Sequence, residues 1–315
     1  MELVTIAKRN NPFTKLKGRI WRSKYLILMI LPAVVFYIIF CYIPMYGILM
    51  AFQNYKSKLG IWGSPWIGFD NFRKVFEEEK FWLAFRNTLF IGSVKIVISF
   101  VAAVTIALLL NELRMIKTKK TVQTIVTFPH FLSWVVVAGF VISLFSGKGA
   151  INSVLKLIGL TEKSIPFLSD EKFLFGVIFA SDVWKEAGWG SIIYLATMAG
   201  IPQDQYEAAD IDGATRMQKI WHITLPGIKP TAILLLIMSV GGVLSAGFDQ
   251  ILNLANKAVI DKINIIDTYI YYHAIVGSDS AGVGTAIGLF KSVIGFTLVI
   301  IVDRIAKACG ERGII

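Results

Sequence analysis

The sequence predicts an all-α membrane protein with six transmembrane helices and both termini in the cytoplasm. Hydrophobic residues fill 55% of the 315 positions and charged residues only 17%, whereas a soluble domain of this size carries nearer a quarter charged residues. The apolar residues form long continuous runs, and crossing a hydrocarbon core of roughly 30 Å takes about 20 helical residues. Alternating segments of about ten residues, which are typical of a β-barrel, are not evident. The excess apolar surface is therefore expected to face lipid.

Six runs are long enough to cross the bilayer, and they form one transmembrane domain over residues 25–305. We expect the spans at about 25–50, 87–110, 122–145, 173–199, 230–253 and 281–302. The first run is longer than the apolar part of a signal peptide and lacks a small-residue cleavage site, so it should remain as an uncleaved span. A basic segment, 1–24, precedes the domain, and a short cytoplasmic tail, 306–315, follows it.

The positions of the basic residues set the expected orientation. Seven of the 32 lysines and arginines lie between Lys8 and Lys24, directly before the first span, and four lie between Arg114 and Lys120. Basic clusters beside membrane spans mark cytoplasmic loops, so the N-terminus is expected inside. An even number of spans returns the C-terminus to the same side. This clustering also explains the net charge of +11 without nucleic-acid binding.

Several kinds of catalytic or binding site have no signature in the sequence. Two cysteines cannot support a disulfide framework, and the three histidines lie in different segments without the spacing of metal ligands. The nearest imitation of a G-x-x-x-x-G-K-[ST] phosphate loop is Gly288-Leu-Phe-Lys-Ser292, which lacks the glycine before the lysine and falls inside a span. We therefore expect no catalytic residue, no bound metal and no enzyme activity in this chain.

The most informative stretch is the polar loop 201–230, between the fourth and fifth spans. Its notable residues are Glu207, Ala208, Ala209, Asp212, Gly213, Ile223, Leu225 and Pro226. Gly213 can turn the chain without Cβ strain, and the prolines at 226 and 230 are expected to stop one helix and start the next. A plain solvated hairpin would need only polarity and a glycine. It would explain neither the spacing nor the closing Leu-Pro.

This pattern, Glu207-Ala208-Ala209 followed by Gly213, Ile223 and Leu225-Pro226, resembles the cytoplasmic coupling loop of the membrane subunits of binding-protein-dependent ABC importers of type I fold. Other stretches resemble the sugar-importing branch, and most of all permeases for oligosaccharides released from complex polysaccharides. They include YIPMYG and AFQNY in the first span, IGFDNF after it, WKEAGW in the fourth span, and GLFKS in the sixth. Together they cover about residues 25–305.

The resemblance implies one half of a permease pair in the bacterial cytoplasmic membrane. A second homologous permease subunit, expected to give a heterodimer, would complete the pathway. Two ATPase subunits would bind ATP and Mg²⁺, and an extracellular solute-binding protein would deliver the carbohydrate, so this chain would need no cofactor of its own. Glu207 would pair with a basic group of an ATPase subunit, and Gly213 would set the angle between two short helices. Alternatively, Glu207 is only an acid favoured by a helix N-terminus.

Polar and aromatic residues inside the spans mark a candidate substrate pathway. A charge at the bilayer centre costs roughly 2.5–3.5 kcal/mol, so such residues should face partners or water. Sugar rings present apolar CH faces to indoles, while acids and amides bind their hydroxyl groups. The candidates are Trp184, Lys185, Trp189, Asp249, Gln250, Asn253 and Lys291. Interfacial tryptophans and polar helix ends are an equally simple explanation. Asp182 and Lys185 could pair along one helix face, with Glu186 pointing elsewhere.

Lys291 lies near the middle of the sixth span and has no acid three or four residues away. We expect it to line a cavity with Trp184, Trp189 and Asp249. Its possible acidic partners are Asp182 and Glu186 on the fourth span and Asp249 on the fifth. An anionic sugar would suit Lys185 and Lys291. The alternatives are an ABC permease for a non-sugar solute and a self-sufficient secondary transporter. The absence of inverted-repeat signals counts against the second.

Overall fold

The computed structural model describes residues 23–276, 281–308 and 310, which are mostly helical. The helices are α2 (Lys24–Tyr37), η1 (Ile38–Tyr42), η2 (Ile43–Phe52), α3 (Gly60–Gly63), α4 (Asp70–Glu77), α5 (Glu79–Asn111), α6 (Ile116–Thr127), η3 (Phe128–Phe131), α7 (Trp134–Phe145), α8 (Ala150–Leu157), α9 (Glu171–Ala199), α10 (Gln203–Ile211), α11 (Arg216–Lys219), η4 (Ile220–Thr224), α12 (Leu225–Gly241), η5 (Val243–Ser245), α13 (Phe248–Leu254), α14 (Ile260–Ile263), α15 (Ile266–Ile270), η6 (Tyr271–Ile275) and α16 (Ala281–Ala308). Most of the basic segment that set the expected orientation lies outside the described residues.

Within the described part of the chain, five helices are long and apolar enough to cross a membrane. They are the stretches Lys24–Phe52, Glu79–Asn111, Trp134–Leu157, Arg216–Gly241 and Ala281–Ala308. The third of these joins α7 and α8 across the non-helical residues 146–149. The fourth predicted span, 173–199, is present as the 29-residue helix α9. It carries Asp182, Lys185 and Glu186 near its middle, and these charges lower its mean hydropathy. Hydropathy alone therefore underestimates the ability of α9 to span a membrane, because its charged side chains are paired inside the bundle.

Pro129 divides the third predicted span, 122–145, into two helices. A proline cannot donate its backbone nitrogen, and its ring clashes with the carbonyl four residues earlier. The chain accordingly tightens into the 3₁₀ turn η3 and restarts as α7, where the Ser133 hydroxyl accepts a hydrogen bond from the Val136 N–H at 3.4 Å. A 12-residue helix is about 18 Å long. Neither α6 nor α7 alone has the length of a span.

The fifth predicted span, 230–253, is also wrong as a single helix. The helix α12 ends at Gly241, and the backbone takes left-handed φ values of 45° at Ala246 and 84° at Gly247 before α13 begins. Because left-handed residues cannot continue a right-handed helix, the chain changes direction there. The candidate pathway residues at 249, 250 and 253 therefore lie on a separate short helix.

The expected break at the prolines of residues 226 and 230 does not occur. Instead, α11, η4 and α12 form one helix from Arg216 to Gly241. The wider π turn at Ile220–Thr224 lies directly before Pro226, and the Leu225 N–H bonds to the Ile220 carbonyl. A shift to bonds five residues apart changes the register around the proline, so the helix continues through it.

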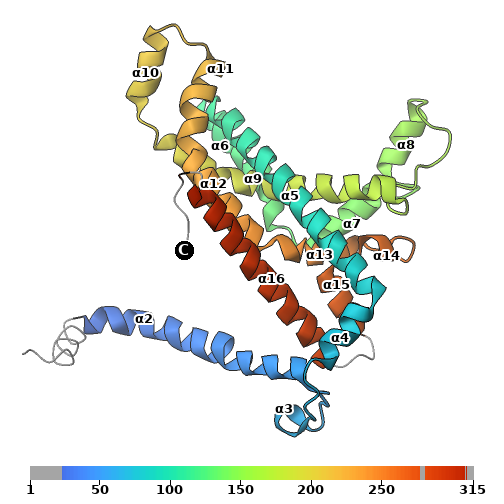
Figure 1. Cartoon of the computed structure of the whole chain (residues 1–315). Coiled ribbons are helices and arrows are strands. Elements are labelled where there is room, and N and C mark those ends of the chain that lie inside the picture. Colours follow the sequence, from blue (N-terminus) through green and yellow to red (C-terminus); the bar gives the residue numbers. More distant parts are fainter. Residues whose placement is uncertain (1–22, 277–280, 309, 311–315) are drawn as a thin grey trace, which may run out of the picture.

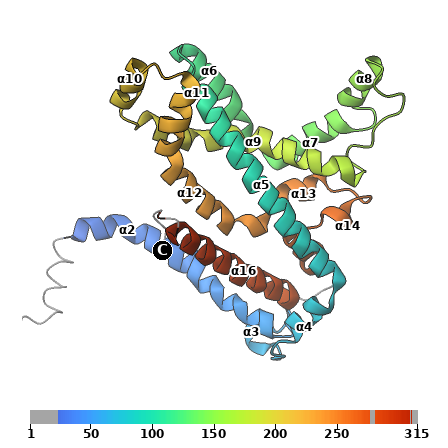
Figure 2. The same ribbon diagram turned by 45° about the horizontal axis from the view of Figure 1, so that its top comes forward.

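The long helix α5 runs diagonally through the bundle and crosses α9 (Figures 1 and 2). It contributes residues to three clusters of buried hydrophobic side chains, one towards each end and one in the middle. At two crossings the backbones are too close for a side chain. A Cβ at Gly92 would collide with the Val243 carbonyl, and one at Gly188 with the Val126 carbonyl. Such glycines set how closely the helices pack.

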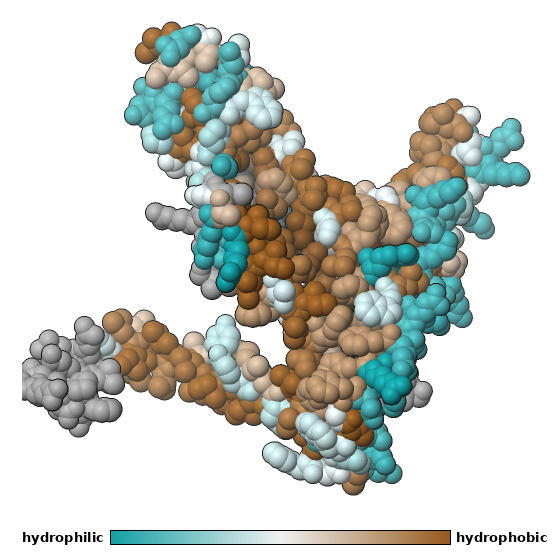
Figure 3. Space-filling view, in the orientation of Figure 1, coloured by the Kyte–Doolittle hydropathy of each residue, from teal (hydrophilic) through white to brown (hydrophobic). Residues whose placement is uncertain are grey.

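Hydrophilic residues gather over α10 and α11 at one end of the molecule and along its opposite edge, with a broad hydrophobic surface between them (Figure 3). The helix α2 leaves this bundle and has no buried residue (Figure 1). Its apolar side chains include Met29, which is 78% exposed, and Phe40 in the following turn is 63% exposed. In a membrane these side chains would be covered by lipid or by another subunit.

Candidate functional site

The loop predicted from its polarity folds into a short helix, a turn and the start of a long helix. The helix α10 covers Gln203–Ile211, and Gly213 follows it with φ of 75°, a conformation that favours glycine. Thr215 and Gln218 then form a capping box at the start of α11. Gly213 therefore turns the chain as expected, but the second of the two expected short helices is the start of the long helix Arg216–Gly241.

One side of α10 contacts the long helix that follows through a hydrogen bond and an ion pair. The Tyr206 hydroxyl lies 2.9 Å from the Thr224 hydroxyl, and Lys219 Nζ lies 2.6 Å from Asp210 Oδ1. The remaining residues of the predicted coupling pattern are less enclosed: Glu207, Ala208, Asp212, Gly213 and Pro226 are exposed, and Ala209, Ile223 and Leu225 are half-buried. The helix α10 is thus exposed on one side, while its other side is bound to the long helix through Tyr206 and Asp210.

The predicted pathway residues do not form one group. Trp184 is 52% exposed and lines an apolar groove of about 530 Å³ between α7 and α9. Trp189, on the same helix, lines a different cavity. Asp249 is exposed and its carbonyl accepts a hydrogen bond from the Asn253 amide at 2.7 Å. Lys291 lies on α16 beside yet another pocket.

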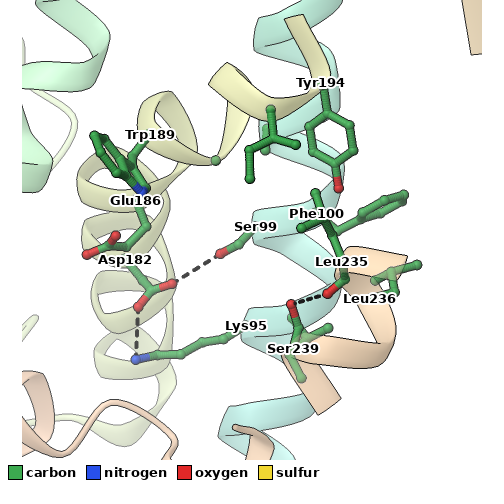
Figure 4. A pocket seen from close by; sticks show the side chains of 14 residues that line it. Lys95, Ser99, Phe100, Asp182, Glu186, Trp189, Tyr194, Leu235, Leu236 and Ser239 are labelled. Atoms are coloured by element: carbon green, nitrogen blue, oxygen red, sulfur yellow. Dashed lines mark hydrogen bonds and ion pairs between the residues drawn. The ribbon is translucent and has the colours of Figure 1, made fainter. Parts of the chain in front are cut away.

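The cavity at Trp189 has a volume of about 370 Å³ and lies between α5, α9 and α12 (Figure 4). Its polar wall is built on Lys95, whose Nζ lies 3.0 Å from Asp182 Oδ1. The other oxygen of Asp182 accepts a hydrogen bond from the Ser99 hydroxyl at 3.1 Å. Lys95 also donates to the side-chain oxygen of Gln250, which is fully buried. Asp182 therefore pairs with α5, and the expected Asp182–Lys185 pair is wrong.

A second polar group lies behind Trp189. Lys185 is buried, and its Nζ donates to Glu186 Oε1 at 2.9 Å and to the His130 carbonyl at 2.8 Å. Glu186 Oε2 lies 2.7 Å from His130 Nδ1. The His130 ring stacks on Trp189 with centroids 4.5 Å apart and planes 5° from parallel. Glu186 therefore does not point away from this network, as the sequence suggested, but joins its members.

Lys291 finds its acidic partner outside the elements where we expected it. Its Nζ lies 2.6 Å and 2.8 Å from the two carboxylate oxygens of Asp267, on α15. The expected partners were Asp182, Glu186 and Asp249. Asp267 lies between the fifth and sixth predicted spans, in a segment expected to be an outer loop, where it was not considered as a partner for a lysine in a span.

The predicted pathway residues did not include four that line the cavity: Lys95, Ser99, Asp182 and Glu186. They also lacked His130, which stacks on Trp189 without lining the cavity. The signal for Lys95 and Asp182 was present, because an ionisable residue within a span is a functional candidate by default. For Ser99 and His130 the sequence carries no comparable signal. Their positions depend on the crossing of α5 with α9 and on the turn that Pro129 imposes.

Comparisons with known proteins agree with this architecture. Residues 95–310 match the family model described as "Binding-protein-dependent transport system inner membrane component". The polygalacturonan/rhamnogalacturonan transport system permease protein YteP of Bacillus subtilis (strain 168) is 41% identical over 295 residues, covering 93% of this chain and 91% of that protein.

Two solved structures are similar over nearly the whole chain. One is a chain of a bacterial ABC transporter involved in the import of the acidic polysaccharide alginate, with a TM-score of 0.85, 37% identity and coverage of 93% of this chain and 99% of that one. The other comes from a bacterial alginate ABC transporter in complex with an alginate pentasaccharide-bound periplasmic protein, with a TM-score of 0.85, 36% identity and coverage of 95% and 100%. This chain is therefore a multi-pass membrane protein that belongs to the family of binding-protein-dependent transport system inner membrane components.

Proposed function

We propose that this chain is a permease subunit of an ATP-driven importer and forms half of the translocation pathway for a carbohydrate, an oligosaccharide from a complex polysaccharide. The observation that carries the proposal is the uncovered Glu207–Ala208 face of α10, at a hydrophilic end of the molecule. Partner ATPase subunits would bind ATP and Mg²⁺ and dock against this face. This chain itself would not hydrolyse ATP.

A movement of α10 has a direct path to the cavity. The contacts of Tyr206 with Thr224 and of Asp210 with Lys219 join α10 to the helix Arg216–Gly241. The same helix lines the cavity through Leu235, Leu236 and Ser239. A displacement of α10 by an ATPase subunit would therefore shift one wall of the cavity, which is the kind of coupling that alternating access needs.

The carbohydrate assignment rests on the relatives and on the cavity wall. The relative YteP is named for polygalacturonan and rhamnogalacturonan transport, and the similar solved transporter is involved in the import of alginate. In this chain, Trp189 offers a flat apolar surface beside the polar groups of Asp182 and Glu186. Apolar ring faces and hydroxyl groups of a sugar fit such a wall. We place Trp189 in the pathway, with Lys185 and Gln250 as buried supports of the wall that hold Glu186 and Lys95.

Two further partners complete the proposal. The helix α2 has no buried residue and stands apart from the bundle, which suits a second permease subunit that covers part of it. The similar alginate transporter is in complex with a periplasmic protein that holds an alginate pentasaccharide, so we propose an extracellular solute-binding protein for this chain as well.

Co-purification of the ATPase subunits with Gly213→Arg tests the coupling role. Gly213 has φ of 75° and open space around its Cβ position, so arginine brings a strain of about 1–2 kcal/mol and a bulky charge without an internal clash. Gly159→Arg is the matched control, because Gly159 also has φ of 75° and open space. It follows α8, which lies far from α10 (Figure 1). We expect Gly213→Arg to lose the ATPase subunits, or to keep them with hydrolysis uncoupled from uptake, while Gly159→Arg keeps both. Full co-purification and coupled uptake in Gly213→Arg would refute the role.

A further inference from the structure

The ionisable groups around the Trp189 cavity bear on the charge of its substrate. Three of them line the cavity: Lys95, Asp182 and Glu186. The side chains of Asp182 and Glu186 are 14% and 33% exposed, whereas that of Lys95 is 9% exposed. A substrate that enters this space meets more carboxylate than ammonium surface.

The cation of the wall is already occupied. An ammonium group has three hydrogen-bond donors, and Lys95 directs two of them to Asp182 at 3.0 Å and to the buried side chain of Gln250. Gln250 is fixed in turn, because its amide donates to the Ile178 carbonyl at 2.7 Å and to the Ser181 hydroxyl at 2.9 Å. Because the side chain of Lys95 is only 9% exposed and its charge is already balanced by Asp182, a substrate carboxylate would gain little from it.

The two lysines that would suit an anionic sugar are also occupied. Lys185 is 5% exposed and is held by Glu186 and the His130 carbonyl, with its Nζ 5.5 Å from the centre of the Trp134 ring. Lys291 is bound by both oxygens of Asp267. Neither lysine lines the cavity at Trp189.

The remaining surface of the cavity suits an uncharged sugar ring. Trp189 is 45% exposed and is backed by the parallel His130 ring, which limits its rotation. Carboxylate oxygens accept hydrogen bonds only, so Asp182 and Glu186 can take the hydroxyl protons of a neutral sugar. Ser99 also lines the cavity on the side of Asp182, and Ser239 lines it from α12 (Figure 4).

We infer that the cavity formed by this subunit accepts a neutral sugar residue and disfavours a uronate. The ring would stack on Trp189, with Asp182 and Glu186 as hydroxyl acceptors. A uronate carboxylate would instead face two carboxylates of like charge, whereas the ammonium group that lines the cavity, on Lys95, is little exposed and already paired with Asp182. The inference rests on the proposed function, and it concerns the sugar residue at this position, so an oligosaccharide that carries carboxylates elsewhere is compatible with it.

A matched pair of disaccharides tests the inference: galactobiose and digalacturonate, which differ at C6 by a hydroxymethyl group against a carboxylate. Binding of each to the purified, assembled permease complex would be measured by calorimetry at fixed ionic strength, in the absence of the solute-binding protein. We expect galactobiose to bind at least tenfold more tightly than digalacturonate. We expect Glu186→Gln to narrow the ratio to about threefold or less, and Trp189→Leu to weaken both sugars. Lys156→Gln, on α8, serves as a control that leaves the ratio unchanged.

The other possible outcomes contradict either this inference alone or the proposed sugar pathway as well. Equal or tighter binding of digalacturonate by the unchanged complex overturns the inference and leaves the carbohydrate pathway standing. An unchanged ratio in an assembled Glu186→Gln complex also overturns it, because the carboxylate then plays no part in selection. Binding of neither disaccharide, or no effect of Trp189→Leu, overturns both the inference and the assignment of this cavity to a sugar. If Glu186→Gln fails to assemble, the ratio in the unchanged complex decides by itself.

Discussion

At the scale of single residues, two ion pairs within the helix bundle join different elements. Lys95 on α5 pairs with Asp182 on α9, and Lys291 on α16 pairs with Asp267 on α15. Taking an ion out of water costs several kcal/mol, which its partner only partly returns. The pairs therefore make the helix arrangement specific more than they make it stable.

Removing one member of the Lys95–Asp182 pair should be more damaging than removing both. Asp182→Asn leaves a buried ammonium without its counter-ion, a loss of about 3–5 kcal/mol. The double variant Lys95→Met/Asp182→Asn has no uncompensated charge and should regain part of this loss. The measurement is the thermal unfolding midpoint of the purified protein in detergent for both single variants and the double variant. Additive losses in the double variant would show that the two side chains do not stabilise each other.

The sequence identified these charges as residues in need of partners but could not identify the partners. A lysine in a span predicts an acid nearby, and that much holds for Lys95, Lys185 and Lys291. The acid that is chosen depends on the crossing of helices far apart in the chain, as between residues 95 and 182. For this reason the expected Asp182–Lys185 pair was wrong, although its spacing along one helix was suitable.

At the scale of the helices, close backbone contact decides the packing as much as apolar surface does. Gly188 on α9 lies against the Val126 carbonyl of α6, and Gly92 on α5 against the Val243 carbonyl. A side chain at either position would separate the two backbones. Small residues at such crossings are typical of helices in membranes, where lipid is as apolar as a leucine side chain.

Gly188→Ala should therefore destabilise the protein, whereas Gly176→Ala should not. Both glycines lie in α9, but a Cβ at Gly176 would meet no atom within 4 Å. Overpacking at Gly188 should cost about 1–3 kcal/mol, while alanine at Gly176 should be neutral or stabilising by up to about 1 kcal/mol. Thermal unfolding in detergent and the yield of monodisperse protein provide the comparison. Equal stability of the two variants would mean that α6 and α9 do not approach as closely as described.

The ends of the helices were the least predictable feature of the fold. The helices at α5, α9 and α16 agree with three predicted spans, because each is one long run without an internal proline. Proline acts in two ways in the other spans. Pro129 ends a helix. At Pro226 the helix continues, because a π turn precedes the proline and changes the hydrogen-bond register. Which of these occurs depends on what the neighbouring helices can accommodate, and a single sequence does not contain that information.

At the scale of the whole molecule, a hydrophobic surface separates two hydrophilic regions, and we predict that the region with α10 and α11 faces the cytoplasm. In a protein whose two natural cysteines are replaced by serine, Leu160→Cys should react with an impermeant thiol reagent in whole cells. Ala214→Cys should react only after the membrane is permeabilised. Leu160 lies in the segment after α8, and residue 214 in the turn after α10. Labelling of residue 214 alone in whole cells would reverse the orientation.

The loop at 201–230 was the part of the candidate site whose structure the sequence predicted best. Its pattern depends on residues close together in the chain, so the helix at α10 and the turn at Gly213 follow from local chemistry. The cavity was predicted poorly, because Trp184 and Trp189, five residues apart on one helix, line different spaces. A position on a helix does not indicate what packs against that face.

The central claim is that this chain carries a sugar through the membrane with energy supplied by partner ATPases. Uptake of a radiolabelled oligosaccharide into proteoliposomes tests it most directly, with the complete complex, its solute-binding protein, and ATP on the side that exposes α10. We predict that uptake requires ATP hydrolysis, and that Gly213→Arg abolishes uptake while Gly159→Arg does not. Uptake at the same rate without ATP, or by the permease subunits alone down an ion gradient, would contradict the claim.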